Sequence, residues 1–343
     1  MRHVPALGIA REDWVLAGLL LATVVVVSLL TPAFLQPENL LEMSRFFVET
    51  GLIALAMAPV IITGGIDLSV GSIVGLSVVV MGLAWRLGHL PPALGVLTGL
   101  FTGLLCGLGN GLCVARLRLP PLIVTLATMA LYRGLALGLG ANAPVSDFPP
   151  AYYELGQAYY TIPGGLQVPQ QLPILLLVLC FAWLALHRSV LGRYVYAIGH
   201  NERAAWFAGV PVARVKMALY AFCGLVSGLA GAIYLSRVAT AKADAGTLME
   251  LDVITVCVLG GVSITGGRGG VAGTMLGLLI VSSLVRGLTL ARVPSEDQKI
   301  VLGFVLLLAA TVYQLLQWRG GRSGPSGSRS SGDERRIPTA EGE

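Results

Sequence analysis

"TGGIDLSVGSIVG", residues Thr63 to Gly75, places one acidic residue and several glycines inside a long apolar region. Apolar residues run up to this stretch from Leu52 and continue beyond it through Leu83. A carboxylate at the centre of a bilayer costs about 2.5–3.5 kcal/mol, whereas an aliphatic residue returns only about 0.3–0.6 kcal/mol. Asp67 is therefore costly in a lipid-embedded segment and needs a compensating role.

Asp67 follows two glycines and precedes a renewed apolar segment, which is the position of a helix N-cap. We expect its carboxylate to accept hydrogen bonds from the amides of Ser69 and Val70, at the positive end of a half-helix. Such a cap explains why no Lys or Arg is needed nearby. Two interpretations remain open, a purely structural cap and a polar group that also lines a solute pathway.

The composition is that of a membrane protein. The 343 residues are 55% hydrophobic and 12% charged, with a mean hydropathy of +0.79, whereas soluble domains are about a quarter charged. We therefore predict an all-α polytopic membrane protein. The net charge of +5 comes from basic residues at the ends of apolar segments, without a basic patch, so nucleic acid is not an expected partner. The cysteines lie inside apolar runs and are interpreted as packing residues: Cys106, Cys113, Cys180, Cys223 and Cys257.

Apolar runs of spanning length predict about ten transmembrane helices. The first run, Trp14 to Leu30, is long for a signal-peptide core and has no small-residue cleavage site after it, so we predict a spanning helix. The segments near Asp67 and Gly266 are broken by glycines and have the least defined boundaries. The ten runs cover residues 14–30, 46–64, 70–88, 92–114, 121–140, 172–187, 214–236, 250–265, 271–290 and 299–317.

The positions of Lys and Arg predict the orientation. The segment from Gly134 to Leu186 has neither residue, and its loop contains two acids and four tyrosines, so we place this loop outside and both termini in the cytoplasm. The basic residues on the inner side are Arg2, Arg11, Arg116, Arg118, Arg188, Arg193, Arg203, Arg214, Lys216, Arg319 and Arg322. Five others oppose this orientation: Arg45, Arg86, Arg237, Lys242 and Arg292.

The chain divides into a transmembrane domain, residues 1–317, and a tail, residues 318–343. The tail is polar and rich in Gly and Ser, so we expect a disordered cytoplasmic extension.

Two glycine patterns indicate how the helices pack. Glycines at strict four-residue spacing line one face of the run 92–114, which allows another backbone to approach closely; they are Gly95, Gly99, Gly103, Gly107 and Gly111. The second pattern is an echo: "GGIDLSVG" (64–71) resembles "GGVSITGG" (260–267). Because transporters are often built from two repeats with broken helices at corresponding positions, the echo predicts two related halves. A chance match in a glycine-rich chain is the alternative.

Motifs for catalysis are missing from the sequence. None of its three lysines stands in a P-loop frame, its four histidines are isolated, and no nucleophile elbow appears. We therefore predict no catalytic residues, no metal, no cofactor and no enzymatic activity. Proton or ion coupling is not expected either, because such pathways use chains of intramembrane acids and Asp67 is nearly alone at depth.

The most basic inner loop, His187 to Lys216, contains a short helix. Asn201 is a good N-cap, Glu202 lies in the first turn, and Gly209 ends the helix, so we predict a helix of about two turns near 201–208. A helix this short needs a partner surface. Its Ala204, Ala205, Trp206 and Phe207 offer an apolar one to a partner protein, or alternatively to the lipid interface.

Three long segments resemble the permease subunits of bacterial ATP-binding-cassette importers for monosaccharides, the ribose, arabinose, xylose and galactose group. They are "TGGIDLSVGSIVGLS" (63–77), "GRYVYAIGHNERAAWFAGVPVARVKMALYAFCGLVSGLAGAIY" (192–234) and "ELDVITVCVLGGVSITGGRGGVAGTMLG" (250–277), and the resemblance extends from Leu40 to Leu316. Within the family, "VTLATMALYRGLAL", "DFPPAYYELGQAYY" and the Ser236–Arg237 pair are most similar to rhamnose-type permeases, with autoinducer-2 permeases second. The segment "VRGLTLARVPSEDQKIVLG" is more charged than is usual there, and the tail is longer.

The resemblance implies a type II-like importer permease fold in the bacterial inner membrane. It also implies a separate ATPase subunit, a periplasmic sugar-binding protein, and a second permease copy or a sister permease. It implies a sugar pathway through polar residues, for which we single out Asp67, Ser69, Asn110, Ser263 and Thr265. The short inner helix would receive the motion of the ATPase through Gly199, Asn201, Glu202, Ala204, Ala205 and Gly209. The alternatives are import of autoinducer-2, a stand-alone channel or facilitator that binds no ATPase, and, third, an intramembrane enzyme.

Overall fold

The computed structural model describes residues 11–140, 143–305, 307 and 311 of the chain. Its long helices are α1 (Arg11–Leu30), α2 (Pro37–Ile62), α3 (Val70–Gly88), α4 (Pro92–Gly111), α5 (Pro121–Gly140), α10 (Val212–Val238) and α12 (Val271–Leu290). Shorter helices are α6 (Glu154–Gln157), α7 (Leu172–Trp183), α8 (Val190–His200), α9 (Glu202–Phe207) and α11 (Met249–Leu259). The strands β1 (Tyr159–Thr161) and β2 (Gln167–Pro169) form an antiparallel hairpin.

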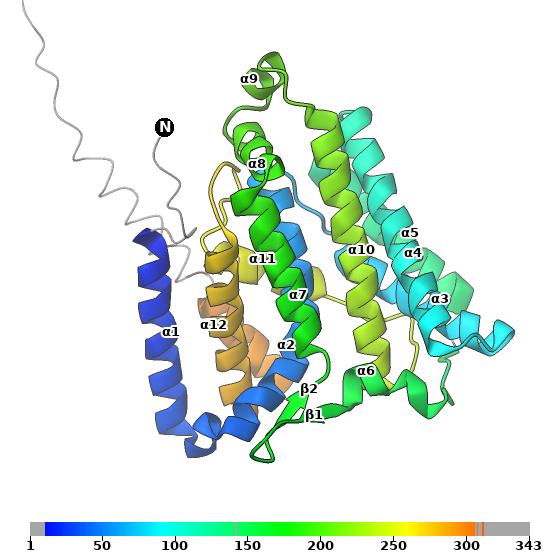
Figure 1. The fold of residues 1–343 in the computed structure, drawn as a ribbon, viewed down its shortest axis with the longest axis vertical. Coiled ribbons are helices and arrows are strands. Elements are labelled where there is room, and N and C mark those ends of the chain that lie inside the picture. The colour runs from blue at the N-terminus through cyan, green and yellow to red at the C-terminus, as the bar shows by residue number, and fades with distance from the viewer. Residues whose placement is uncertain (1–10, 141–142, 306, 308–310, 312–343) are drawn as a thin grey trace, which may run out of the picture.

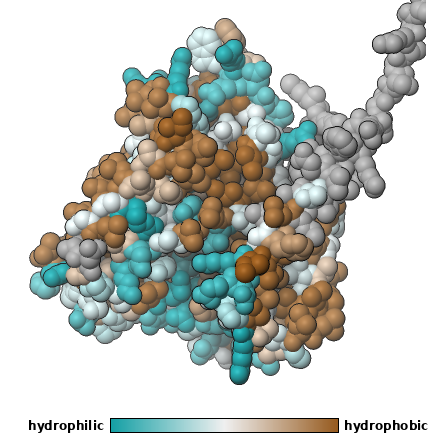
Figure 2. Space-filling view, turned by 180° about the vertical axis from the view of Figure 1, so that it is seen from behind, coloured by the Kyte–Doolittle hydropathy of each residue, from teal (hydrophilic) through white to brown (hydrophobic). Residues whose placement is uncertain are grey.

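The helices lie side by side in a bundle with two distinct ends (Figure 1). One end, called here the α9 end, contains α9 and the segments 112–120, 187–211 and 260–270. The opposite end, called the hairpin end, contains β1, β2, α6 and the turns 31–36 and 88–91. Seen from behind, the surface is largely hydrophobic, with hydrophilic residues gathered at the tip and over the lower middle (Figure 2). This distribution suits a bundle surrounded by lipid.

Seven helices of the described residues are long and apolar enough to cross a membrane, and α7 with α8 makes an eighth if this pair, bent by 68°, is one span. Three predicted runs, 70–88, 121–140 and 271–290, agree with α3, α5 and α12 at both ends. The predicted run 46–64 is longer, because α2 starts at Pro37. The run 299–317 is only partly described, with helix from 295 to 305. The fold is thus the predicted all-α polytopic class, and the described residues contain seven or eight spans rather than about ten.

The predicted span 250–265 is wrong. Helix α11 has 11 residues, which is about 16 Å at the helical rise and roughly half of a ~30 Å hydrocarbon core. It begins after Leu248, whose φ is +67°, and ends at Gly260. The preceding segment, residues 239–248, turns back from the end of α10 into the bundle, and we call it the re-entrant segment. Hydropathy alone does not reveal the end of α11, because the apolar residues Val262 and Ile264 in the loop after Gly260 continue the run.

The glycine ladder of α4 packs against its neighbours as predicted. A Cβ at Gly103 or Gly107 would fall on the backbone of α10, at Gly224 and Tyr220, respectively. A Cβ at Gly95 would lie 2.6 Å from the Tyr152 hydroxyl. Helices α4 and α10 therefore approach each other closely, because the glycines of the ladder have no side chains.

The sequence echo has a structural counterpart at two helix ends. Gly64 (φ +78°) follows α2, and Gly261 (φ +79°) follows α11. In each case the next amide, of Gly65 or Val262, donates to a carbonyl five residues earlier, which is the Schellman arrangement. In the sequence echo Gly64 aligns with Gly260, whereas in the structure Gly64 corresponds to Gly261, one position later. The C-termini of α2 and α11 both lie at the α9 end of the bundle, where the Gly267 amide donates to the Ile62 carbonyl at 2.9 Å.

Residues 1–10 and the tail 318–343 lie outside the described residues, so the disordered cytoplasmic tail remains a prediction.

Candidate transport site and partner surface

Asp67 is the centre of a fully buried polar network between α3 and α4. Its Oδ1 accepts from the Ser69 amide at 2.9 Å and from the Ser69 hydroxyl at 2.7 Å. The Asn110 Nδ2 lies 3.3 Å from Oδ1 and 3.2 Å from Oδ2, and donates to the Ser69 hydroxyl at 2.8 Å. Tyr132 of α5 donates to the Asn110 Oδ1 at 3.3 Å. Asp67, Ser69 and Asn110 are each 0% exposed, so hydrogen bonds rather than water solvate the carboxylate.

The predicted cap is half correct. The Ser69 amide donates to Asp67 as expected, but the Val70 amide is not among the donors to Asp67 in the described residues. The first helical residue is Val70 and the N-cap is Ser69, so Asp67 lies two residues before the N-cap and forms an Asx-type turn. The sequence did not predict that Asn110 and Tyr132 belong to the hydrogen-bond network of Asp67, although Asn110 was singled out for the sugar pathway.

The five predicted pathway residues do not form one site. Asp67, Ser69 and Asn110 share the buried network, whereas Ser263 and Thr265 lie in the loop between α11 and α12 at the α9 end. Their hydroxyls are 2.9 Å apart, and Thr265 is exposed. Helix α11 ends at Leu259, so this loop lies beyond the helix rather than within a membrane span. The five residues therefore lie in two separate places, and their role in a sugar pathway stays a prediction.

Arg133 of α5 holds the re-entrant segment against α3. Its Nη1 donates to the carbonyls of Ala243 at 2.5 Å and Ala245 at 2.9 Å, and its Nη2 to that of Gly71 at 3.2 Å. A Cβ at Gly75 of α3 would lie 2.6 Å from the Arg133 Nη1, so the glycine makes room for the guanidinium. Sequence analysis missed this residue, although an arginine inside an apolar run of spanning length is itself a signal of a functional or structural site.

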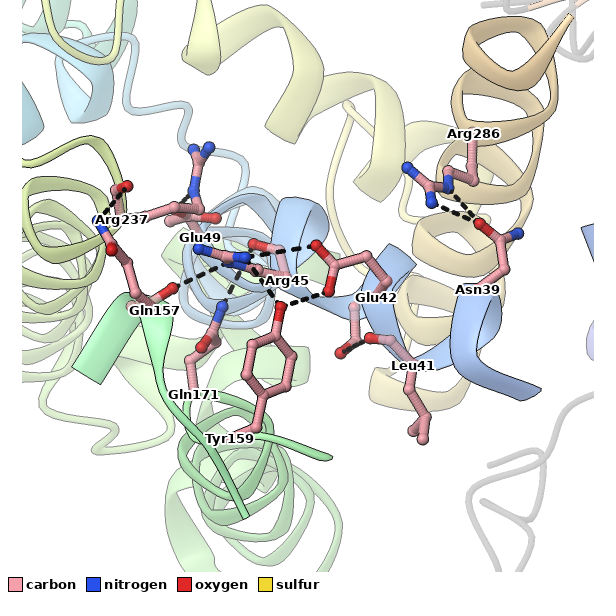
Figure 3. Close-up of polar contacts among 12 residues, drawn as sticks. Asn39, Leu41, Glu42, Arg45, Glu49, Gln157, Tyr159, Gln171, Arg237 and Arg286 are labelled. Carbon is pink, nitrogen blue, oxygen red and sulfur yellow. Dashed lines mark hydrogen bonds and ion pairs between the residues drawn. The ribbon is translucent and has the colours of Figure 1, made fainter. Parts of the chain in front are cut away.

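Asp67 is not nearly alone as a buried acid. Glu49 of α2 is 1% exposed and Glu250 of α11 is 8% exposed. Glu49 pairs with Arg237 of α10, whose Nε lies 2.8 Å from the Glu49 Oε1. Figure 3 shows this pair beside α6, where Gln157 donates to the Arg237 carbonyl at 3.2 Å. The expectation that Asp67 is nearly alone at depth is therefore wrong, because Glu49 of α2 and Glu250 of α11 are buried as well.

A second polar cluster at the hairpin end joins α2 to β1 (Figure 3). The Arg45 Nη1 donates to the Tyr159 hydroxyl at 2.8 Å, and this hydroxyl donates to the Glu42 Oε2 at 2.6 Å. Burial, together with the hydrogen bond to Glu42, raises the pKa of Tyr159, so its hydroxyl remains a donor. Arg45 and Arg237, two of the basic residues that opposed the predicted orientation, are thus paired with carboxylates at this end.

The short helix predicted near 201–208 is present as α9. The Asn201 side chain accepts from the Ala204 amide at 3.0 Å, and Gly209 has φ +83°, so both ends are as predicted. The Lys216 ammonium of α10 lies 2.6 Å from the Glu202 carboxylate and anchors the helix. Trp206 and Phe207 are 59% and 81% exposed. The helix therefore presents two aromatic side chains outward at the α9 end.

Two residues predicted to couple this helix to a partner lie inside the fold instead. Ala205 is 5% exposed, on the face of α9 that points toward its own bundle. Gly199 of α8 packs against the end of α2, where a Cβ would fall on the Ile62 carbonyl. The expectation that Ala205 contributes to an outward apolar surface is wrong, because a two-turn helix must use one face to pack on its own chain. Ala204 is exposed with the two aromatic residues.

The described residues contain no group of three or more His, Cys, Asp or Glu side chains that could hold a metal ion.

Comparison with known proteins agrees with this architecture. The family profile described as "Branched-chain amino acid transport system / permease component" matches residues 39–310. The ribose import permease protein RbsC of Bacillus subtilis (strain 168) is 42% identical over 289 residues, which cover 83% of this chain and 88% of that protein. The fructose import permease protein FrcC of Rhizobium meliloti is 37% identical, covering 78% and 75% of the two chains.

A third relative is the autoinducer 2 import system permease protein LsrD of Escherichia coli O9:H4 (strain HS), which is 36% identical over 306 residues, covering 87% of this chain and 91% of that protein. No solved structure matches the chain. The predicted resemblance to monosaccharide and autoinducer-2 permeases is confirmed by these relatives. Because the profile spans most of the chain and three import permeases align along their length, the chain belongs to the branched-chain amino acid transport system / permease component family.

Proposed function

We propose that the chain is the membrane-spanning permease subunit of an ATP-driven importer for a monosaccharide. The observation that carries this proposal is the 42% identity to a ribose import permease over 83% of the chain, supported by the fructose import permease. The uncharged polar side chains of Ser, Thr and Asn residues suit a neutral, hydroxyl-rich solute. Catalytic chemistry is assigned to a partner, since the sequence has no P-loop.

The α9 end faces the cytoplasm in this proposal, and both termini are cytoplasmic. The positive-inside rule supports this orientation. Loops at the α9 end and the helix turns beside them contain Arg116, Arg118, Arg188, Arg193, Arg203, Arg214, Lys216 and Arg268. The hairpin end has Glu38, Glu42, Asp147 and Glu154, and two of its arginines are paired with carboxylates.

The ATPase subunit binds at the α9 end, where Trp206 and Phe207 are exposed on a helix that is anchored by the ion pair between Glu202 and Lys216. A sugar-binding protein delivers the solute at the hairpin end. A second copy of the permease, or a sister permease, completes the pore. These partners follow from the class of importer, and α9 is the surface with exposed aromatic residues that fits a protein contact best.

Import of autoinducer-2 is the second candidate, favoured by the 36% identity to an autoinducer 2 permease over 87% of the chain. A stand-alone facilitator is the alternative of a different class. It would carry sugar down a gradient without an ATPase.

Reconstitution tests the proposal directly. The permease is placed in liposomes alone or with a tandem ATPase of a sugar importer, and uptake of labelled ribose, fructose and autoinducer-2 is measured with a sugar-binding protein present. We expect uptake against a gradient only when ATPase and ATP are both present. ATP hydrolysis by the permease alone, or downhill sugar flux at the full rate without the ATPase, would contradict the importer.

A further inference from the structure

A cavity of about 260 Å³ lies between α2, α11 and α12, away from the Asp67 network. Most of its wall is apolar, but several polar side chains converge on it, which is the usual composition of a small-molecule site. The residues that bear on recognition are Phe46, Thr50, Asp252, Ser282, Arg286 and Thr289. Its volume is below the roughly 300–1,000 Å³ of pockets for drug-sized ligands, which suits a smaller solute.

The two charged groups of this cavity are opposite in sign, and both have capacity left for a ligand. Arg286 of α12 donates to the Asn39 Oδ1 through Nε, at 2.8 Å, and through Nη2 (Figure 3). Among the described residues these are the hydrogen bonds of its guanidinium, so the Nη1 donors remain available. The Asp252 carboxylate has no hydrogen bond within the described part of the chain, and the charge of Lys299 acts on it. A carboxylate and a guanidinium therefore line one cavity as acceptor and donor.

The remaining lining completes a site for a polyhydroxylated ring. The Phe46 ring lines the cavity and has the guanidinium carbons of Arg286 and Arg237 at 5.8 and 5.6 Å from its centre, respectively. Thr50 and Ser282 add hydroxyl groups that can donate or accept. Hydrogen bonds to ionised groups are about twice as strong as those between neutral groups, so Asp252 and Arg286 would dominate recognition of sugar hydroxyls.

The position of the cavity suits a solute on its way inward. Asn39 lies near the start of α2 at the hairpin end, whereas Asp252 is an exposed residue in the first turn of α11, just after the re-entrant segment. We propose that this cavity binds a neutral monosaccharide between its entry at the hairpin end and the middle of the membrane, with Asp252 and Arg286 holding its hydroxyls. The proposal rests on the proposed importer function and adds the place where the sugar is held.

Thiol labelling tests whether the cavity is a sugar site or a lipid-filled groove. In a chain with its five cysteines replaced by alanine or serine, Ser282→Cys introduces a thiol of nearly the same size into the wall. We expect a membrane-impermeant thiosulfonate to label it, and D-ribose or D-fructose to slow labelling about tenfold at roughly ten times the Kd, because only the unoccupied fraction reacts. Leu177→Cys on α7 is the matched control. The wild-type Leu177 side chain is 72% exposed and does not line the cavity, so a thiol at this position should face lipid and stay unlabelled.

Transport by the assembled importer supplies the second test. Asp252→Asn removes the charge while keeping the size, and we expect sugar uptake by the assembled importer to fall about tenfold or more. Asp244→Asn is the control, because Asp244 lies on the re-entrant segment and lines a different cavity. An unlabelled or unprotected Ser282→Cys, or normal uptake by Asp252→Asn, would overturn the site while leaving wild-type ATP-dependent uptake intact. Loss of that uptake in the wild type would instead overturn the importer.

Discussion

At the scale of single residues, Asp67 shows how a buried carboxylate is tolerated in an apolar chain. Its oxygens accept from Ser69 and Asn110, and Asn110 in turn accepts from Tyr132. Each partner is a neutral donor, so the negative charge is solvated without a nearby cation. This arrangement favours a structural clamp between α3 and α4, and it leaves the role of Asp67 in transport as a proposal.

We expect the loss of stability caused by a substitution at Asp67 to grow with the number of hydrogen-bond donors that it leaves without an acceptor. Asp67→Ala leaves the Ser69 amide and hydroxyl without an acceptor, and the Asn110 Nδ2 keeps only the Ser69 hydroxyl as its acceptor. We therefore expect the largest loss of stability, on the order of 1–3 kcal/mol for each buried group left unpaired. Asp67→Asn keeps the bonds from Ser69 but brings its own amide against that of Asn110, 3.2 Å away. It should therefore be intermediate. Thermal unfolding in detergent measures the order, and Asp147→Asn, at an exposed residue with φ +61°, is the control.

An exchange of the side chains of Asp67 and Asn110 isolates the contribution of their contact to stability. In the double variant Asp67→Asn with Asn110→Asp, a donor again faces an acceptor, and Tyr132 still has an oxygen to donate to. We expect this variant to be more stable than the sum of the two single changes. Simple additivity would mean that the contact between residues 67 and 110 does not contribute to folding.

At the scale of elements, the closest helix contact depends on glycine. Gly107→Ala places a methyl group on the Tyr220 carbonyl of α10, where backbone rather than a flexible side chain must move. We expect a loss of about 1–3 kcal/mol from overpacking, seen as a lower unfolding temperature. The matched change Gly138→Ala on α5 has nothing within 4 Å and should be neutral or stabilising by up to about 1 kcal/mol. Equal effects of the two changes would refute the packing role of the ladder.

One face of the short helix α9 is exposed to a partner, and the opposite face packs on the bundle. Phe207→Ala removes an aromatic ring that is 81% exposed, so we expect weaker co-purification with the ATPase and reduced uptake, with an unchanged unfolding temperature. Ala205→Arg forces a charge into a contact that is 5% exposed, so it should lower stability as well. Normal complex yield and uptake for Phe207→Ala would favour a helix that rests on the lipid interface.

At the scale of the whole molecule, the two ends of the bundle differ in chemistry as the two sides of a membrane do. The α9 end is rich in Lys and Arg, and the hairpin end contains acids, tyrosines and paired arginines. Impermeant thiol reagents can test this polarity in cells that express a cysteine-free chain with one new cysteine. Thr161→Cys on β1, exposed at the hairpin end, should react in intact cells. Ala208→Cys, exposed after α9, should react only after permeabilisation. The reverse pattern would invert the orientation.

Much of the architecture follows from local chemistry in the sequence. Proline before α5 and glycine at its end mark a span that agrees with the structure at both boundaries. Asn201 and Gly209 define the ends of α9 for the same reason, because helix caps involve hydrogen bonds between residues that are two to four positions apart. The regular spacing of glycines likewise predicted the face of α4 that packs closely.

Features that depend on residues far apart in the chain were decided by the tertiary structure alone. Asn110 reaches Asp67 across 43 positions, and Arg133 reaches Ala243 across 110. The burial of Ala205 and the break before α11 depend in the same way on what packs against each segment. The sequence by itself determined the membrane class, several helix ends and the family, because hydropathy, caps and motifs are local properties. Which polar groups meet, and which faces stay exposed, was set by packing, because in lipid each polar group must find its partner within the fold.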